Sequence, residues 1–553
     1  MLIEYQKNIK KIFKQLPKDE AELAVLKRKL AKQNNINLLT NAELLKIYRQ
    51  LVVKKEIKVN KDLELLLRKR QVRTISGVAP VAVLTKPYQC PGQCIYCPSE
   101  KSMPKSYLSN EPAVMRAKLC QFDPFLQVQA RIKALENNGH DTDKIELIVM
   151  GGTWDYLPEK YRLWFIYECF RAANNFKKET KKLRNKKIKE IRKTLNVLWR
   201  DLYEEQKRNE TAKHRIVGLT LETRPDYVTE KSVLEMRQLG CTRVELGVQH
   251  IDDRILKLNK RGAINKDTIR ATKILRTFGF KITYHLMLNL PGSTSKKDYE
   301  MFIKIFSDKN YQPDQIKIYP CVVNEFAELY NWWQAGKYKP YSTKQLTALL
   351  IKIKKIIPYY VRIIRVIRDI PEESIAAGNK ITNLRHLLKA ECKCIRCREV
   401  GHVGKKSEIR NQKLENKKNI KLFIQTYRVN DGQEFFLSME SGDRKILYAF
   451  CRLYISHKRT IKVDNFDAFT QDTGHLAIIR ELHSYGQLTP LGGKIKSSSQ
   501  HKGLGKKLLK EAEKIAKKNG FKEIMVIAGI GVREYYRQLG YCKLRNTYLV
   551  KKI

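Results

Sequence analysis

Three cysteines in the first fifth of the chain have the residue types and the spacing of an iron–sulfur ligand set. Cys90, Cys94 and Cys97 follow a C-x3-C-x2-C pattern, with Tyr96 directly before the last cysteine. A structural 4Fe–4S cluster normally takes four cysteines, so three would leave one iron open to a substrate or cofactor. The alternatives are a zinc site or a chance group of thiols, and the compact spacing favours the open cluster.

A second cysteine group has the composition of a structural zinc site. Cys392, Cys394 and Cys397 follow one another within six residues, and His386 and His402 lie nearby. Three cysteines and one histidine are a common zinc set, so we expect zinc bound by the three cysteines and His402. The alternative is three reduced thiols without a metal.

Composition limits the class of protein. A chain of 553 residues with 42% hydrophobic residues is long enough for two or three globular domains. It contains no apolar run long enough for a transmembrane helix, and its first residues do not resemble a signal peptide. Six of the twelve cysteines fall in the two groups, which indicates metal binding in a reducing compartment rather than a disulfide framework. We therefore expect a cytoplasmic protein.

The charge of the chain favours a polyanionic partner. There are 109 basic and 57 acidic residues, a formal net charge of +52. A compositional preference for lysine does not by itself explain the deficit of acidic residues, so nucleic acid is the expected partner. The first 72 residues predict basic helices, for which the alternative is a merely solvated charged face. Candidate nucleic-acid contacts are Lys10, Lys11, Lys14, Arg68, Lys69 and Arg70.

Residues 73–385 alternate short apolar strands with helices, which predicts a parallel α/β sheet, here a partial or full (β/α) barrel. Several strands end in polar or glycine-rich turns, where barrel enzymes carry their active sites. The expected strands are Val81–Thr85, Ile145–Met150, Ile216–Glu222, Arg243–Gln249, Lys281–Leu288 and Gln315–Tyr319.

The residues from 420 to 553 predict a second α/β domain, joined to the first by a zinc-binding linker over 386–415. The turn Gln500-His-Lys-Gly503-Leu-Gly505-Lys506 opens an amphipathic helix, and its backbone amides suit a pyrophosphate. An unrelated nucleotide-binding loop is the alternative. The expected strands are Phe423–Val429, Glu434–Met439, Ile446–Leu453, His475–Leu482 and Ile524–Ile527.

These motifs resemble known families. The cysteine loop resembles that of radical S-adenosylmethionine (SAM) enzymes, and the 500–506 turn with the ending Tyr-Tyr-Arg-Gln-Leu-Gly-Tyr541 resembles GNAT acetyltransferases. Together they resemble the catalytic subunit of Elongator and its stand-alone archaeal and bacterial relatives, over nearly the whole chain. Long strings carry the match, among them Asp143-Lys-Ile-Glu-Leu-Ile-Val-Met-Gly-Gly-Thr153 and Gly531-Val-Arg-Glu-Tyr-Tyr-Arg-Gln-Leu-Gly-Tyr541.

The resemblance implies an enzyme that converts the wobble uridine of tRNA anticodons to 5-carboxymethyluridine, using acetyl-CoA and SAM. A 5′-deoxyadenosyl radical would abstract a hydrogen atom from the acetyl methyl group, and the resulting carbon radical would add to C5 of uracil. The implied partners are the tRNA anticodon stem-loop, acetyl-CoA, SAM and an electron donor, with no membrane. The stand-alone relatives lead us to expect activity without accessory Elongator subunits.

The resemblance also implies roles for particular residues. Cys90, Cys94 and Cys97 would hold the cluster, and Lys144 would contact acetyl-CoA, unless it is a plain surface lysine. Tyr535 and Tyr536 would lie near the thioester, unless they only pack in the core. The SAM site would be lined by Gly151, Gly152, Thr153, Glu222, Arg224 and Gln249. The acetyl-CoA site would be lined by Glu481, Leu482, His483, Ser484, Gln500, Gly503, Leu504, Gly505, Lys506 and Tyr536.

The chain departs from the family pattern at three places. Ala263 follows Lys260-Arg-Gly262 where the family usually has histidine, which puts the role of that histidine in doubt. Cys321 replaces a usual threonine, and the last strand reads Asn546-Thr-Tyr-Leu. The cluster cysteines and loop glycines are all present, so we expect an active enzyme.

Two other functions fit parts of the sequence. One is a protein lysine acetyltransferase with a structural cluster, in which Glu481 would act as general base. The high positive charge would repel its basic substrates. The other is a tRNA-binding scaffold without activity, against which the intact motifs argue.

Overall fold

The computed structural model describes residues 13, 17–69, 71–176, 197–381, 384–388, 391–403, 419–457, 476–485, 503–544 and 547–553. Five residues of the predicted sites lie outside these ranges, and nothing further is said of their structure. They are Lys10, Lys11, Lys14, Arg70 and Gln500.

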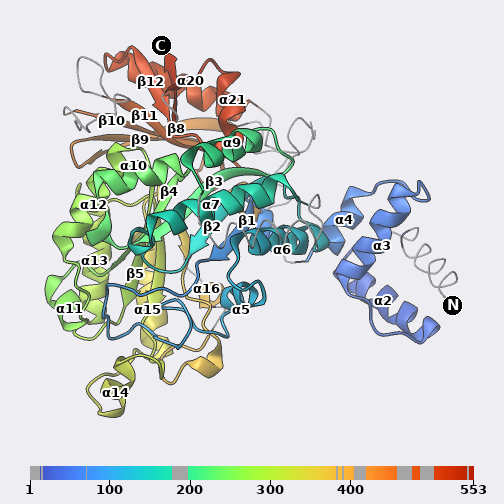
Figure 1. The fold of residues 1–553 in the computed structure, drawn as a ribbon, viewed down its shortest axis with the longest axis horizontal. Helices are drawn as coiled ribbons and strands as arrows, with labels where there is room; N and C mark the ends of the chain where they lie inside the picture. Colours follow the sequence, from blue (N-terminus) through green and yellow to red (C-terminus); the bar gives the residue numbers. More distant parts are fainter. Residues whose placement is uncertain are drawn as a thin grey trace.

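A small helical bundle at the N-terminus lies to one side of the main body (Figure 1). Its helices are α2 (Glu20–Asn34), α3 (Asn41–Val53) and α4 (Lys61–Leu67), and they share a separate apolar core. Each helix begins at a side chain that caps its free amides, and at Thr40 the cap is completed by Glu43. The helices expected in this region are therefore present in its described part, and its role in binding tRNA stays a prediction.

The central domain contains an open sheet of seven parallel strands in sequence order. No pairing joins the first strand to the last within the described ranges, so the barrel is partial. Six strands match the prediction, and the seventh is too short, at four residues, to have stood out in the sequence. The strands are β1 (Ala79–Leu84), β2 (Lys144–Met150), β3 (Arg215–Thr223), β4 (Arg243–Gln249), β5 (Lys281–Leu288), β6 (Gln315–Pro320) and β7 (Arg362–Arg365).

Helices cover the outside of this half-barrel and share its apolar core (Figure 1). Capping side chains at Asp123, Thr229, Thr294 and Ser342 fix where four of them begin. The helices are α5 (Pro112–Leu119), α6 (Pro124–Asn137), α7 (Glu159–Asn174), α9 (Trp199–Asn209), α10 (Glu230–Gln238), α11 (Asp253–Leu258), α12 (Asn265–Thr277), α13 (Ser295–Ser307), α14 (Leu329–Gln334) and α15 (Thr343–Ile356).

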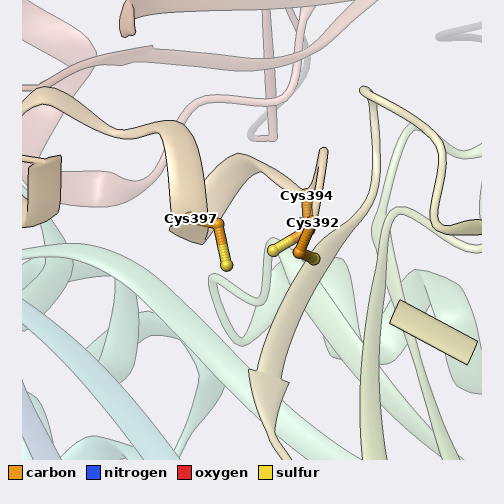
Figure 2. A group of neighbouring side chains, drawn as sticks. All are labelled: Cys392, Cys394 and Cys397. Atoms are coloured by element: carbon orange, nitrogen blue, oxygen red, sulfur yellow. The ribbon is translucent and has the colours of Figure 1, made fainter. Parts of the chain in front are cut away.

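A linker of one-turn helices carries the second cysteine group, drawn in Figure 2. Its helices are α16 (Leu384–Leu387), α17 (Ile395–Arg398) and α18 (Val400–Val403).

The C-terminal domain is a mixed seven-stranded sheet, in the order β13-β14-β12-β11-β10-β9-β8, packed against α20 (Leu504–Lys518). β11 and β12 pair in parallel over only two residues, Ile478–Ile479 with Met525–Val526. The five expected strands are confirmed. The remaining bounds are β8 (Ile420–Val429), β9 (Gly432–Ser441), β10 (Leu447–Ser456), β11 (Ala477–Ser484), β12 (Glu523–Val526), α21 (Arg533–Arg537), β13 (Cys542–Leu544) and β14 (Tyr548–Lys552).

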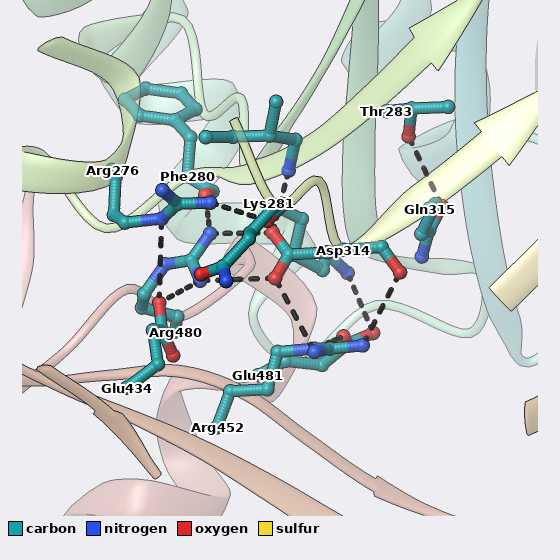
Figure 3. Close-up of polar contacts among 12 residues, drawn as sticks. Arg276, Phe280, Lys281, Thr283, Asp314, Gln315, Glu434, Arg452, Arg480 and Glu481 are labelled. Carbon is teal, nitrogen blue, oxygen red and sulfur yellow. Dashed lines mark hydrogen bonds and ion pairs between the residues drawn. The ribbon is translucent and has the colours of Figure 1, made fainter. Parts of the chain in front are cut away.

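The C-terminal sheet docks on the amino-terminal ends of the barrel strands. Asp314, directly before β6, forms ion pairs with both Arg480 from β11 and Arg452 from β10 (Figure 3). Arg452 also donates to the carbonyl of Tyr360, just before β7, at 2.6 Å. All three charged side chains are fully buried. The two domains therefore form one interlocked body.

None of the helices in the described part of the chain is both long and apolar enough to cross a lipid bilayer.

Candidate active site

The loop after β1 presents the three cysteines at the carboxyl ends of the strands. The Cys97 amide donates to the Cys94 carbonyl at 3.1 Å, and Cys90 Sγ lies 3.9 Å from Thr153 Oγ1 of the next loop. Among the described residues, two groups bring metal-binding atoms within 4.8 Å of one another, and these three cysteines are not one of them. Sulfurs held wider apart than one ion requires suit a polynuclear cluster. Three thiol donors at a strand end therefore fit a 4Fe–4S cluster with an open iron.

Burial raises the pKa of Cys97 to about 12, and the charge of Cys94 adds to this effect. Without a metal this thiol is protonated at neutral pH. Binding of a cluster would therefore release its proton.

Arg224 supports the cysteine loop from the end of β3. Its Nε and Nη2 atoms hold Asp226 at 3.0 and 2.7 Å, and Nη2 also donates to the Arg261 carbonyl. Its Nη1 atom is buried and has no hydrogen-bond partner in the described ranges. A Cβ on Gly92 would overlap this nitrogen, so only glycine lets the cysteine loop approach it. The free Nη1 is a donor aimed at the cluster loop, as a site for a polar ligand requires.

The Gly151-Gly152-Thr153 turn lies beside the same loop. Both glycines have positive φ, +136° and +99°, and a Cβ on Gly151 would overlap the Thr85 hydroxyl. At the end of β4, Gln249 adopts a φ of 67°, uncommon for a side chain other than glycine. Its buried Oε1 atom has no partner among the described residues. These predicted SAM-site residues thus meet at one end of the sheet.

A charged cluster inside the half-barrel contains Glu222, which was predicted to line the SAM site, and three residues that were missed in the sequence. Lys317 pairs with Glu245 and lies 3.8 Å from Glu222, while His285 Nε2 lies 2.9 Å from Glu245. Burial opposes both charges, yet the pairing raises the pKa of Lys317 and lowers that of Glu245 well below its usual range. Because the ammonium already supplies the countercharge, this carboxylate pair is not a metal site. In the sequence, the alternation of polar residues along β4 and β5 could have indicated that one face of these strands carries polar side chains.

The predicted acetyl-CoA site forms where β11 meets the start of α20. Gly503 has a φ of +76° and precedes the first residue of the helix, whose free amides can bind a phosphate. A Cβ built on Gly505 would lie 3.2 Å from the Tyr535 hydroxyl and 3.6 Å from Ser484 Oγ. Leu482 completes this contact at 3.8 Å. The structure therefore brings Leu482, Ser484, Gly505 and Tyr535 together.

The remaining predicted residues of this half have different surroundings. Tyr536 is buried, whereas Tyr535 is 37% exposed. Leu504 packs in the core, so only its backbone faces the loop, and Lys506 is exposed.

Glu481 and His483 contact the barrel through their side chains. Glu481 pairs with Arg452 at 3.0 Å and lies 3.6 Å from Lys281, and His483 lies 2.8 Å from the Ser76 carbonyl. Although burial alone would raise the pKa of Glu481, these cations lower it. A carboxylate held in this way is a weak base, which argues against the lysine acetyltransferase alternative.

Lys144 begins β2, opposite Arg215 on β3, at the barrel end that faces the C-terminal domain. Burial lowers its pKa, against the charges of Asp143 and Asp141. It is far along its strand from the cysteine loop. Of the described basic candidates, Lys69 is exposed, and Arg68 lies 3.4 Å from Asp141.

The second cysteine group converges as a metal site would. The sulfurs of Cys392, Cys394 and Cys397 lie within 4.8 Å of one another, and Figure 2 shows them extending from α17 and the segment before it. Hydrogen bonds from the other two thiols lower the pKa of Cys394 well below its usual range. His402 does not join them, because its Nε2 lies 3.0 Å from Glu399.

Models of three families match the chain. They are the radical SAM superfamily over residues 85–304, the radical SAM C-terminal domain over 313–394 and the acetyltransferase (GNAT) family over 494–541. A half-barrel with an open-iron cysteine loop, fused to a GNAT sheet, defines a radical SAM enzyme with an acetyltransferase domain.

Relatives extend this similarity over most of the chain. The tRNA uridine(34) acetyltransferase of Methanocaldococcus infernus is 45% identical over 503 residues, 88% of each chain. Elongator complex protein 3 of Homo sapiens is 35% identical and covers 88% of this chain and 86% of its own. A solved structure of archaeal Methanocaldococcus infernus Elp3, lacking its N-terminus, has a TM-score of 0.71 at 42% identity and covers 87% of this chain and 100% of its own. The chain belongs to the family of tRNA uridine(34) acetyltransferases and Elongator complex protein 3.

Proposed function

We propose that this protein modifies the wobble uridine of tRNA, forming 5-carboxymethyluridine from acetyl-CoA by radical SAM chemistry. The observation that carries the proposal is the fusion of the cysteine-loop barrel with the GNAT sheet in one body. Deprotonated acetyl-CoA would be a nucleophile, and C5 of uracil is nucleophilic as well, so acid–base chemistry in an acetyl-CoA-binding domain would not join them. A carbon radical formed in the barrel could add to C5. The relatives named for tRNA uridine(34) support the substrate.

In this proposal each end of the barrel has its own task. A cluster held by Cys90, Cys94 and Cys97 would supply the electron that cleaves SAM, and a one-electron donor would reload it. Arg224 and Gln249 would orient SAM through their free polar atoms, together with the glycine turn after β2.

At the other end, the amides of Gly503, Gly505 and Lys506 would bind the pyrophosphate of acetyl-CoA. β11 pairs with β12 at Ile478 and Ile479, and the residues that follow on β11 would pair with the pantetheine arm. Tyr535 would donate a hydrogen bond to the acyl group, with Tyr536 packed behind it. Lys144, at the same end of the barrel, would contact acetyl-CoA.

We further propose a structural zinc ion held by Cys392, Cys394 and Cys397. Their convergence supports this, and it would tie the linker to the barrel. His402 would have to leave Glu399 to become the fourth ligand. The division into a tRNA-binding region (1–72), a radical SAM domain (73–385), a zinc linker (386–415) and an acetyl-CoA domain (420–553) belongs to the same proposal, as does action in the cytoplasm without accessory subunits.

The decisive experiment is mass spectrometry of tRNA nucleosides after anaerobic incubation with reductant, SAM and acetyl-CoA labelled in the acetyl group. The expected product is carboxymethyluridine that contains the label and depends on all three additions. Acetylation of lysine side chains without modified uridine would favour the lysine acetyltransferase instead. Unmodified tRNA that still binds tightly would favour the inactive scaffold.

A further inference from the structure

Three tyrosine rings form a continuous ladder at the cysteine end of the barrel. The rings of Tyr88 and Tyr156 have centroids 6.1 Å apart, and those of Tyr156 and Tyr227 are 5.7 Å apart. The angles between the ring planes are 62° and 85°, so the contacts are edge-to-face. In an edge-to-face contact the edge of one ring lies against one face of its neighbour.

The ladder follows the carboxyl ends of three neighbouring strands. Tyr88 lies four residues after β1 and two before Cys90, Tyr156 follows β2, and Tyr227 follows β3. Tyr156 contacts Tyr88, which lies in the cysteine loop, and also Tyr227, so all three rings lie beside that loop. The ladder therefore lies at the end of the barrel that carries the cysteine loop.

Exposure distinguishes these rings from core residues. Tyr88 is 42% exposed and Tyr156 is 38% exposed, whereas Tyr161 on α7 is 3% exposed. Core packing alone gives no reason to leave two adjacent aromatic rings in water. A partner with flat, stackable groups would cover them.

Cations stand beside the ladder. The Lys86 backbone is fixed by the hydroxyl of Tyr161, at 3.0 Å, and its ammonium lies 4.9 Å from that ring's centroid. Its side chain remains exposed, two residues from Tyr88. On the other side Arg270 donates to the Asp226 carbonyl at 3.3 Å, next to Tyr227, and is 49% exposed. Stacking faces between positive charges are the arrangement that binds single-stranded nucleic acid.

We propose that Tyr88, Tyr156 and Tyr227 form a stacking platform for the unpaired bases of an RNA loop, with Lys86 and Arg270 binding the flanking phosphates. The inference rests on the proposed function, and it names the surface that would receive the anticodon loop. A base that is to enter the barrel must leave its stack, and the platform would replace the stacking that its neighbours lose.

The test compares binding of an anticodon stem-loop RNA with binding of a fully paired duplex of equal length. Tyr88→Ala and Tyr156→Ala should each weaken stem-loop binding about tenfold, within the range for base–aromatic stacking. Tyr88→Phe and Tyr156→Phe keep the ring and should bind as the unchanged protein does. The slope of affinity against salt should not change, because no ionic contact is removed. Leu422→Ala, an exposed apolar residue of the C-terminal domain, is the matched control.

A base analogue in the loop gives a second readout. The fluorescence of 2-aminopurine beside the wobble position should be quenched on binding, and the alanine variants should lose this quenching. Thermal unfolding of each variant shows whether weaker binding comes from the missing ring or from an unfolded protein. If one alanine variant unfolds at a lower temperature than Leu422→Ala, the other alanine variant decides the test.

Three results would overturn the proposal. They are unchanged stem-loop affinity in the folded alanine variants, equal losses for stem-loop and duplex, and loss of SAM binding with RNA binding retained. The last result would mean that the rings cover SAM rather than RNA. If the unchanged protein makes no modified uridine while the alanine variants still lose stem-loop binding, the platform stands and the proposed function fails.

Discussion

Asp314 of the barrel and Arg480 of the GNAT sheet form a bidentate ion pair, with Nη2–Oδ2 at 2.5 Å and Nη1–Oδ1 at 3.1 Å. Burial alone would raise the pKa of Asp314, yet Arg480 and Arg452 hold it at about 2. Glu434 pairs with Arg480 from the other side, so the charges alternate across the interface (Figure 3). Such an arrangement is stable only while every partner stays in place.

Breaking this interface should destabilise both domains. Arg480→Met leaves Asp314 and Glu434 without one of their cations, a loss of about 3–5 kcal/mol in the free energy of unfolding. The urea midpoint should fall for probes in the barrel and in the GNAT domain alike. Lys514→Met, in the exposed pair with Glu511, is the control and should change stability by about 1 kcal/mol or less. A transition that moves only in the GNAT domain would show that the domains unfold independently.

Loss of one cluster ligand should abolish SAM cleavage. Cys94→Ala removes a thiolate, so the absorbance of the reconstituted cluster and the formation of 5′-deoxyadenosine should both disappear. Cys542→Ala, at an exposed thiol on β13, should keep both. Normal deoxyadenosine formation by Cys94→Ala would contradict the radical SAM assignment.

The two tyrosines of α21 should differ in their effect on acetyl-CoA. Tyr535→Phe removes the hydroxyl beside Gly505, so acetyl-CoA turnover and carboxymethyluridine formation should fall together by about fivefold, the value of a neutral hydrogen bond near 1 kcal/mol. Tyr536→Phe should have the smaller effect, because its ring is buried in the core. SAM cleavage measured without tRNA reports whether the cluster is intact. A larger loss in Tyr536→Phe would reverse the two roles.

Lys317 should be needed for the stability of the half-barrel. Lys317→Met leaves the buried Glu245 with His285 and the more distant Arg243, at 4.0 Å, and we expect a loss of about 3–5 kcal/mol. The double variant Lys317→Met, Glu245→Gln should recover part of it, since no unpaired charge remains. Lys352→Met, at an exposed position of α15, is the matched control for thermal unfolding. Equal melting temperatures for Lys317→Met and this control would mean that water solvates Glu245 inside the half-barrel.

Asp155 should make stability depend on pH. Burial raises its pKa to about 7 from 3.8, so its contribution to stability is complete below pH 3.8 and is lost as the pH rises through about 7. Asp155→Asn should flatten the fall in unfolding free energy between those values. Asp252→Asn is the contrasting control, because the hydrogen bond from Arg254 lowers the pKa of Asp252, so its contribution to stability is present above pH 3.8 and is lost as the pH falls. Parallel curves for Asp155→Asn and the unchanged protein would refute the assignment.

Most of the strands could be predicted because each is a short apolar run followed by a turn, whereas β7, β13 and β14 were not predicted in this way. The cluster inside the half-barrel could not be predicted, because its members lie on different strands and only register brings them together. Glu222 pairs opposite Glu245, and His285 opposite Lys317, once the strands align. No spacing along the chain encodes those neighbours.

The candidate acetyl-CoA strand shows a second limit. An extra residue, Arg480, interrupts the pairing of β11 with β10, so that Glu481 pairs with Arg452 and Ile479 with Leu453. This bulge lets Arg480 and Glu481 both reach the barrel, whereas Leu482 and Ser484 face α20. A family motif marks the strand but not which of its side chains face the ligand. In the same way His402 was predicted beside the cysteines, and Glu399 holds it instead.

The nine residues of β3 run between the two ends of the barrel, about 30 Å at the rise of a parallel strand. Buried ion pairs hold the GNAT sheet at one end of the barrel. A hinge motion that moved the sheet toward the cysteines would separate these ion pairs and leave buried charges without partners. The acetyl group would therefore reach the cysteine end through the pantetheine arm of acetyl-CoA rather than through a motion of the protein domains. A swinging arm, with the acyl group at its tip, would have to reach into the barrel while the fold stands still. The length of that arm would then select the acyl donor, and a short thioester would bind without reacting.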